Sequence, residues 1–236
     1  GVTGRDADVI ATPFKYNSVI LYNETMGYAS FLLPALLILI IHQTLFFGIG
    51  MSAGTAREEN TFYKMIPKNS GRSVFHVVIG KALCYFSWYL SIASYIFGFS
   101  PKLFNLPHLG NPIDIALIAI PFLLAAIFFS MTLSVFIRNR ETGFVVFLFT
   151  SLVLLFLSGS SWPMSSVHSF WKTFSLLFPS TFGINGFIKI NSMGATLSQV
   201  DKEFIGLWIQ AGFYFISTLV VYRWQIVQSR NRLIEN

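Results

Sequence analysis

Five long windows of this 236-residue sequence contain almost no charged side chains. Only 11% of the residues are Asp, Glu, Lys or Arg, against about a quarter in soluble domains. The windows are 25–56, 73–101 (interrupted only by Lys81), 115–137, 142–171 and 204–222. Several of them reach the roughly 20 apolar residues that cross a bilayer core. The sequence therefore predicts an all-α membrane protein and excludes a soluble enzyme, a fibrous protein and a disordered chain.

Turn-forming and charged residues divide the apolar sequence into five expected transmembrane helices. The second and third are separated by the Pro- and Asn-containing stretch 98–112, the third and fourth by the short turn 138–141, and a polar tail begins at Arg223. The expected helices are approximately 27–51, 74–97, 113–137, 143–157 and 204–222.

The distribution of Lys and Arg predicts the orientation. Nine of the 16 basic residues lie in the segments 55–73, 138–141 and 223–236, which fall on the same side of the membrane if all five helices cross it. The side richer in Lys and Arg is cytoplasmic. We therefore expect a multi-pass protein of the bacterial plasma (inner) membrane with a cytoplasmic C-terminus and Gly1 outside, which in turn requires at least one crossing upstream.

The basic residues form no dense run, so the net charge of +6 is attributed to membrane flanks and lipid contact, not to nucleic acid. Lys81 lies near the cytoplasmic end of its helix, from where its ammonium group can extend to the interface. Cys84 is the only cysteine, which excludes an intrachain disulfide and a cysteine-based metal cluster.

The region 158–203 contains two apolar stretches that are each too short to cross the bilayer. They are Phe170–Phe178 and Thr181–Ile190, separated by Pro179. One interpretation is an outer re-entrant helical hairpin, which requires neighbouring helices to satisfy the exposed backbone groups. The alternative is a pair of helices that lie flat at the interface.

The cytoplasmic loop 55–72 is predicted to contain a short helix of its own. Thr55 and Glu58 have the spacing of a capping box, in which hydroxyl and carboxylate satisfy free N–H groups at a helix start. Pro67 would end this helix. Such a helix can act as a lever for a cytoplasmic partner, or it can be a solvated connector without a partner.

Several motifs together resemble the permease subunits of type-2 ATP-binding-cassette (ABC) exporters. On the cytoplasmic side these are Arg57-Glu58-Glu59-Asn60-Thr61, Ile66-Pro67 and Gly80-Lys81. On the outer side they are Leu157-Ser158-Gly159, Trp162-Pro163-Met164, Leu177-Phe178-Pro179 and Gly183-Ile184-Asn185-Gly186. The resemblance extends over residues 28–223.

The resemblance implies that the five helices are the second to sixth of a six-helix permease. Residues 1–26 would then be the end of an external domain or a linker, and 27–236 the transmembrane domain. Two permease subunits, identical or different, would form the substrate path, and a periplasmic adaptor is a further candidate partner. The loop 55–72 would be the coupling loop that docks on the ATPase subunit.

The residues that the resemblance assigns to ATPase coupling come from two segments. They are Arg57, Glu58, Glu59, Asn60, Thr61 and Lys64 in the loop, and Arg138, Arg140 and Glu141 in the turn. The family's usual Arg-Glu-Arg-Glu run is replaced here by Arg-Glu-Glu-Asn at 57–60, so the ion pairs to the ATPase are expected to differ.

The chain contains no GxxxxGK[ST] phosphate-binding loop, so ATP and Mg²⁺ are expected to bind to a separate ATPase subunit. No catalytic residue, metal ligand or cofactor is assigned to this chain, which is therefore predicted not to be an enzyme. Phe46, Phe47, Phe147 and Phe149 are candidates for lining or gating the path, with ordinary packing as the alternative. Gly50 and Gly54 form a GxxxG motif, which permits close helix packing between or within subunits.

Two other classes of protein were considered. Glu58-Glu59 with His42 and His76 resembles the Glu and His sets of intramembrane metalloproteases of the prenyl-protein-processing type. However, the four histidines have no HExxH spacing. A passive membrane scaffold is the third possibility, and only the resemblance of the coupling loop argues against it.

Overall fold

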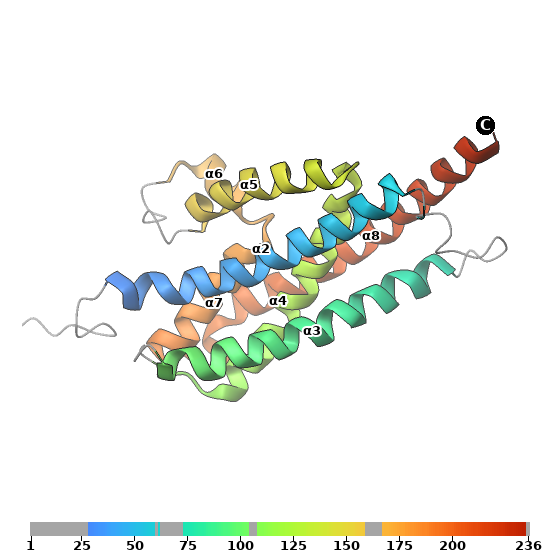
Figure 1. The fold of residues 1–236 in the computed structure, drawn as a ribbon. Coiled ribbons are helices and arrows are strands. Elements are labelled where there is room, and N and C mark those ends of the chain that lie inside the picture. Colours follow the sequence, from blue (N-terminus) through green and yellow to red (C-terminus); the bar gives the residue numbers. More distant parts are fainter. Residues whose placement is uncertain (1–27, 60, 62–72, 104–107, 159–166, 235–236) are drawn as a thin grey trace, which may run out of the picture.

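The computed structural model describes residues 28–59, 61, 73–103, 108–158 and 167–234 (Figure 1). In these ranges the chain is helical and contains no strand. The α-helices are α2 (Tyr28–Glu58), α3 (Ser73–Leu103), α4 (Pro112–Leu133), α5 (Arg140–Leu157), α6 (Ser169–Ser175), α7 (Pro179–Met193) and α8 (Asp201–Ile234). Two 3-10 turns, η2 (Ser134–Phe136) and η4 (Leu197–Val200), precede α5 and α8.

Five of these helices, α2, α3, α4, α5 and α8, are long and apolar enough to cross a membrane. This confirms the all-α membrane fold, and in the described residues the number of such helices equals the number of expected crossings. The expected segment 1–26 lies outside the described residues.

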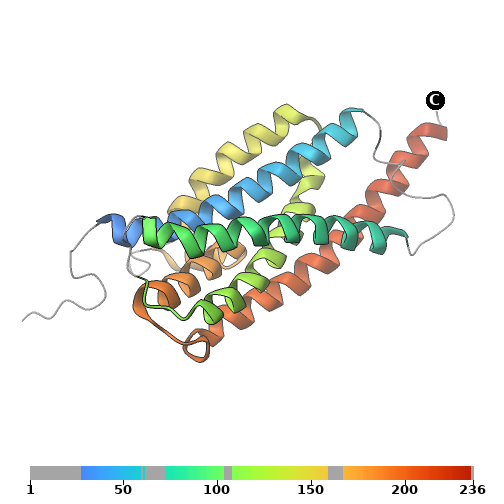
Figure 2. The ribbon, with the colours of Figure 1, turned by 60° about the horizontal axis from the view of Figure 1, so that its bottom comes forward.

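Helix α4 forms the centre of the bundle. It packs against α2, α3, α7 and α8, and runs through the middle of the molecule in both views (Figures 1 and 2). Its side chains Leu123, Ala126, Ile127 and Met131 are fully buried. Helix α5 packs mainly on α2, at the edge of the bundle, and leaves most of its apolar side chains exposed.

Several helix boundaries differ from the expected ones. Helix α3 continues past 97 to Leu103, so the start of the expected connector 98–112 is helical. Helix α8 begins at Asp201 and continues to Ile234, although a polar tail was expected from 223. Charged residues end the stretch that can lie in lipid, but Arg and Gln are good helix formers and do not end the helix.

The C-terminal end of α2 was also predicted incorrectly. The first helix was expected to end at 51, with a new helix capped by Thr55 and Glu58, but α2 continues without a break to Glu58. The Thr55 hydroxyl donates a hydrogen bond to the Met51 carbonyl inside α2, 2.9 Å away, and so does not cap a new helix. No Pro occurs between Met51 and Glu58, and the single glycine, Gly54, weakens a helix without ending it. The rest of the expected loop helix lies outside the described residues.

Side-chain caps define the other helix ends close to the sites. Asn111 accepts a hydrogen bond from the Ile113 amide at the start of α4, and Asn139 does the same for Thr142 at the start of α5. Because Asn139 caps it, α5 begins at Arg140 and not at 143 as expected. Helix α4 ends at Leu133, so the last part of the expected segment 113–137 is the 3-10 turn η2 and Ile137.

The two short apolar stretches form α6 and α7, as two separate helices. Helix α7 packs against α2, α4 and α8, and one face of it is buried in the bundle. From α8, Gln210 Nε2 donates to the Leu176 carbonyl and Tyr214 Oη to the Leu177 carbonyl, both at 2.6 Å. These hydrogen bonds give partners to two backbone carbonyls at the bend between α6 and α7. An ion pair between Lys189 Nζ and Glu203 Oε1, 2.6 Å long, joins α7 to α8.

Candidate coupling site

The GxxxG motif lies where α2 meets the α4–α5 junction of the same chain. A Cβ atom at Gly54 would lie 2.9 Å from the backbone carbon and oxygen of Asn139, and one at Gly50 would lie 2.6 Å from Ile137 Cδ1. At Gly54 only glycine permits this approach, because such short contacts do not occur between real Cβ atoms and backbone. At Gly50 the neighbour is the end of a side chain, which can move. The structure therefore shows close packing of this motif within one subunit.

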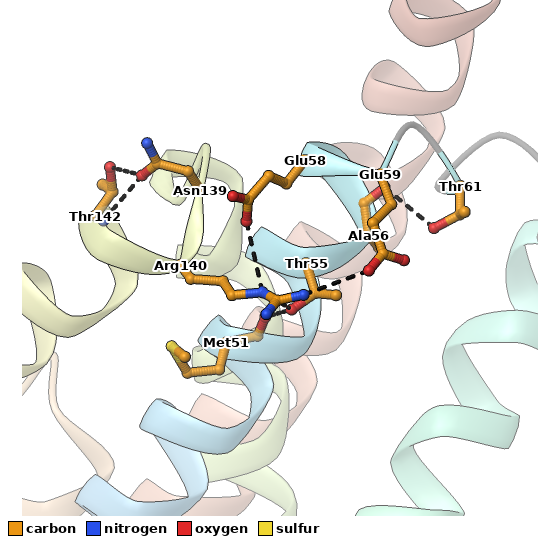
Figure 3. Close-up of polar contacts among 9 residues, drawn as sticks. All are labelled: Met51, Thr55, Ala56, Glu58, Glu59, Thr61, Asn139, Arg140 and Thr142. Carbon is orange, nitrogen blue, oxygen red and sulfur yellow. Dashed lines mark hydrogen bonds and ion pairs between the residues drawn. The ribbon is translucent and has the colours of Figure 1, made fainter.

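Arg140 joins the two segments that were assigned to ATPase coupling (Figure 3). Its Nε atom lies 3.0 Å from Thr55 Oγ1 and 3.5 Å from Glu58 Oε2, and its Nη2 atom lies 3.3 Å from Glu59 Oε1. We call these four residues the charged clasp. All three charged side chains are about half exposed, so each ion pair contributes little stability, roughly 0–1 kcal/mol. The clasp is therefore better suited to recognition than to stabilising the fold.

The backbone around Asn139 positions Arg140 in the charged clasp. Asn139 has an extended conformation, with φ −141° and ψ 172°, and its side chain accepts hydrogen bonds from both the amide and the hydroxyl of Thr142. This cap makes Arg140 the first residue of α5. Arg138 and Glu141 are exposed beside it. The two candidate coupling segments therefore form one surface, although Glu59 and Arg140 are 81 positions apart in the chain.

Arg57 behaves differently from its neighbours Glu58 and Glu59. Its Nη1 atom donates to the carbonyls of Ser134 (2.6 Å) and Ile137, and its Nη2 atom donates to Gln225 Oε1 at 2.9 Å. Successive residues of an α-helix point about 100° apart, so Glu58 can join the exposed clasp while Arg57 extends into the subunit. The structure thus separates residues that the sequence grouped together.

The remaining coupling candidates are only partly described. The Thr61 amide donates to the Ala56 carbonyl at 2.9 Å, which keeps Thr61 directly beyond the end of α2. Asn60 and Lys64 lie outside the described residues.

The four candidate gate residues do not form one group. Phe46 is buried and its ring centroid lies 6.3 Å from that of Phe129 in α4. Phe47 and Phe147 are in contact between α2 and α5, with ring centroids 4.8 Å apart. Phe149 is 69% exposed and belongs to the outer face of α5. The Phe47–Phe147 pair is the part of this set that could respond to a movement of α2 against α5.

The residues that suggested a metalloprotease are not assembled into a metal site. Across the described parts of the chain, no group of three or more His, Cys, Asp or Glu side chains could hold a metal ion. His42 is fully buried and lies against Phe129 with 5.4 Å between ring centroids. The two glutamates instead contact Arg140. This arrangement gives the metalloprotease alternative no support.

Two residues of the site were not recognised in the sequence. Ser134 and Gln225 accept hydrogen bonds from Arg57, but neither belongs to a motif, and Gln225 falls in the expected polar tail. A useful signal was available for Gln225, since its spacing from Tyr222 and Ile226 places it on the same face of a continued helix as these buried residues. Lys81 likewise has a partner in this region, with its Nζ atom 5.7 Å from the centre of the Tyr222 ring.

The described residues contain five helices long and apolar enough to cross a membrane, with a charged surface at one end, which defines a multi-pass membrane protein. The sequence matches the family model described as "ABC-2 family transporter protein" over residues 4–220. The chain belongs to this family and is a permease component of an ABC transporter. A search of curated proteins and a search of solved structures found no match.

Proposed function

We propose that the chain is the permease of an ABC export system and is driven by a separate ATPase subunit that docks on the charged clasp. The observation that carries this proposal is the contact of Arg140 with Glu58 and Glu59. It joins the end of α2 to the start of α5 in one exposed surface. A motor that pushes on this surface moves two spanning helices together, which a contact with an isolated loop would not do.

Other features support the same arrangement. The chain has no phosphate-binding loop of the GxxxxGK[ST] type, so ATP and Mg²⁺ belong to the partner. The basic residues of 55–73, 138–141 and 223–236 favour a cytoplasmic position for the clasp and the C-terminus in the bacterial inner membrane. No cofactor of this chain is needed in such a mechanism.

A second permease subunit, identical or homologous, is part of the proposal. The outer face of α5 exposes several large apolar side chains, among them Phe149 at 69% and Leu152 at 60%. In a membrane this face is covered by lipid or by another subunit. Cross-linking of Leu152→Cys in a Cys84→Ser background distinguishes the two, because only a subunit contact at this face gives a linked dimer.

The test of the proposed function is purification of the full permease from membranes, with identification of the proteins that accompany it. We expect an ABC ATPase subunit to co-purify with the wild-type chain, and ATP hydrolysis by this complex. The double variant Glu58→Gln and Glu59→Gln, and separately Arg140→Ala, should release this subunit. Lys202→Ala is the matched control, because Lys202 is exposed at the opposite end of α8.

Three outcomes would contradict the proposal. The first is a wild-type chain that carries no ABC ATPase, which would favour a passive scaffold. The second is full retention of the ATPase by both clasp variants, which would place the docking surface elsewhere. The third concerns orientation. Green fluorescent protein fused after Asn236 should fluoresce if the C-terminus is cytoplasmic. A fusion that does not fluoresce, together with an active alkaline phosphatase fusion at the same point, would place the C-terminus outside.

A further inference from the structure

Arg57 donates hydrogen bonds to two buried backbone carbonyls in the junction that follows α4. Helix α4 stops at Leu133, and the chain passes through η2 to Ile137, which is extended at φ −89° and ψ 107°. The Ser134 carbonyl also accepts a hydrogen bond from the Ile137 amide, 3.1 Å away. Buried carbonyls beyond the end of a helix need partners of this kind within a membrane protein. Ser134 and Ile137 are both fully buried, and the Arg57 guanidinium donates to the carbonyls of both.

The same guanidinium also reaches α8. Its Nη2 atom donates to Oε1 of Gln225, whose side chain is 8% exposed. A guanidinium suits this position because its planar fork presents several N–H donors in fixed directions. One side chain therefore connects the end of α2, the α4–α5 junction and α8. The ammonium group of a lysine is a single point charge and cannot make the same set of contacts.

Arg57 is the neighbour in sequence of a residue of the charged clasp, so it can connect the clasp to the interior of the subunit. The next residue, Glu58, belongs to the charged clasp, so the outward contact and the inward contact start from consecutive positions of one rigid helix. Gly54, one turn earlier, lies against the backbone of Asn139. A displacement of the clasp is thus transmitted to the α4–α5 junction by packing and by Arg57, and to α8 by Arg57.

We propose that Arg57 is a positioning residue that makes the cytoplasmic ends of α2 and α8 move as one body during the transport cycle. This inference rests on the proposed function, because it assumes that ATP-driven movement begins at the clasp. In this role Arg57 transmits movement inside the subunit. The sequence motif had instead placed Arg57 among the residues that contact the ATPase.

The test measures a distance between α2 and α8 in the complete transporter in lipid nanodiscs. Spin labels are placed at Ser52 and Arg223, both exposed, in a Cys84→Ser background, and labelled subunits are diluted with unlabelled ones so that distances within one subunit dominate. Pulsed electron resonance is recorded without nucleotide and after trapping with ATP and vanadate. ATP hydrolysis by the same samples, before vanadate is added, shows whether the cycle proceeds.

In the otherwise unmodified transporter we expect one narrow distance distribution that nucleotide does not change. Gln225→Ala and Arg57→Ala should retain the ATPase subunit but show a broader distribution that shifts on trapping. Arg57→Lys should be intermediate. Lys202→Ala is the control, since Lys202 is exposed at the far end of α8, and should leave the distribution unchanged. If Arg57→Ala fails to fold, Gln225→Ala tests the α8 contact without altering the cation.

The possible contrary results are distinguishable. Nucleotide-independent distances in Gln225→Ala and Arg57→Lys, with hydrolysis intact, would overturn the proposal. Loss of the ATPase subunit from Arg57→Ala with an unchanged distribution would make Arg57 a docking residue. If Arg57 only stabilises the fold, its variants should melt at a lower temperature but show no nucleotide-dependent change in the distance between the labels. Absence of any ABC ATPase from the wild-type preparation would instead refute the proposed function.

Discussion

Replacing Gly54 with alanine tests the close contact between α2 and the α4–α5 junction. The added Cβ atom would lie 2.9 Å from the backbone carbon and oxygen of Asn139. Backbone cannot rotate away as the end of a flexible side chain can, so α2 or the junction has to shift. Gly48 offers a matched control in the same helix, because a Cβ atom there meets nothing within 4 Å.

The comparison of the two variants isolates the cost of the clash. Glycine in a helix interior is less favourable than alanine by roughly 0.5–1 kcal/mol, and this gain applies to both substitutions and cancels in their difference. Overpacking of a tight contact costs about 1–3 kcal/mol. Gly48→Ala should therefore be neutral or stabilising, and Gly54→Ala should be less stable than Gly48→Ala by about 1–3 kcal/mol.

Thermal unfolding of the purified protein in detergent measures this difference. For a chain of this size 1 kcal/mol corresponds to roughly 2–4 °C in Tm, so the two variants should differ by about 2–12 °C. Gly54→Ala should also weaken the charged clasp, because Arg140 follows Asn139 directly. A Gly54→Ala variant that melts at or above the temperature of Gly48→Ala would refute the packing described at this contact.

Three further substitutions test other contacts by the same melting measurement. Asn139→Ala removes the cap of α5 and should lower stability by about 1 kcal/mol; an unchanged Tm would show that the cap is replaced by water. His42→Leu removes two buried ring nitrogens that have no hydrogen-bond partner in the described structure, so Tm should stay constant or rise, and a large fall would reveal a partner of the ring. Lys189→Ala leaves the carboxylate of Glu203, which is 13% exposed, without its partner. This variant should lower Tm more than Arg140→Ala, because the ion pairs of Arg140 are half exposed. A larger fall in Tm for Arg140→Ala would contradict this reasoning.

The class of the protein and the number of spanning helices could be predicted from the sequence. Whether a segment can lie in lipid depends on its own length and polarity, and both can be counted along the chain. The helix ends could not be predicted in the same way. Asn139 is a residue type that favours helix starts, and it does cap α5. Thr55 also fits a capping pattern but lies inside α2. A capping residue takes effect only where the backbone leaves the helical conformation.

The candidate coupling residues show the same division between sequence and structure. The sequence indicated that Arg57, Glu58 and Arg140 lie at charged breaks between apolar segments. It did not show that Glu58 contacts Arg140 or that Arg57 contacts Gln225, which is 168 positions further along the chain. Such contacts depend on how α2, α5 and α8 are rotated and packed. The sequence by itself determined which segments enter the membrane, and only the tertiary structure decided which charged side chain faces outward and which one connects helices within the subunit.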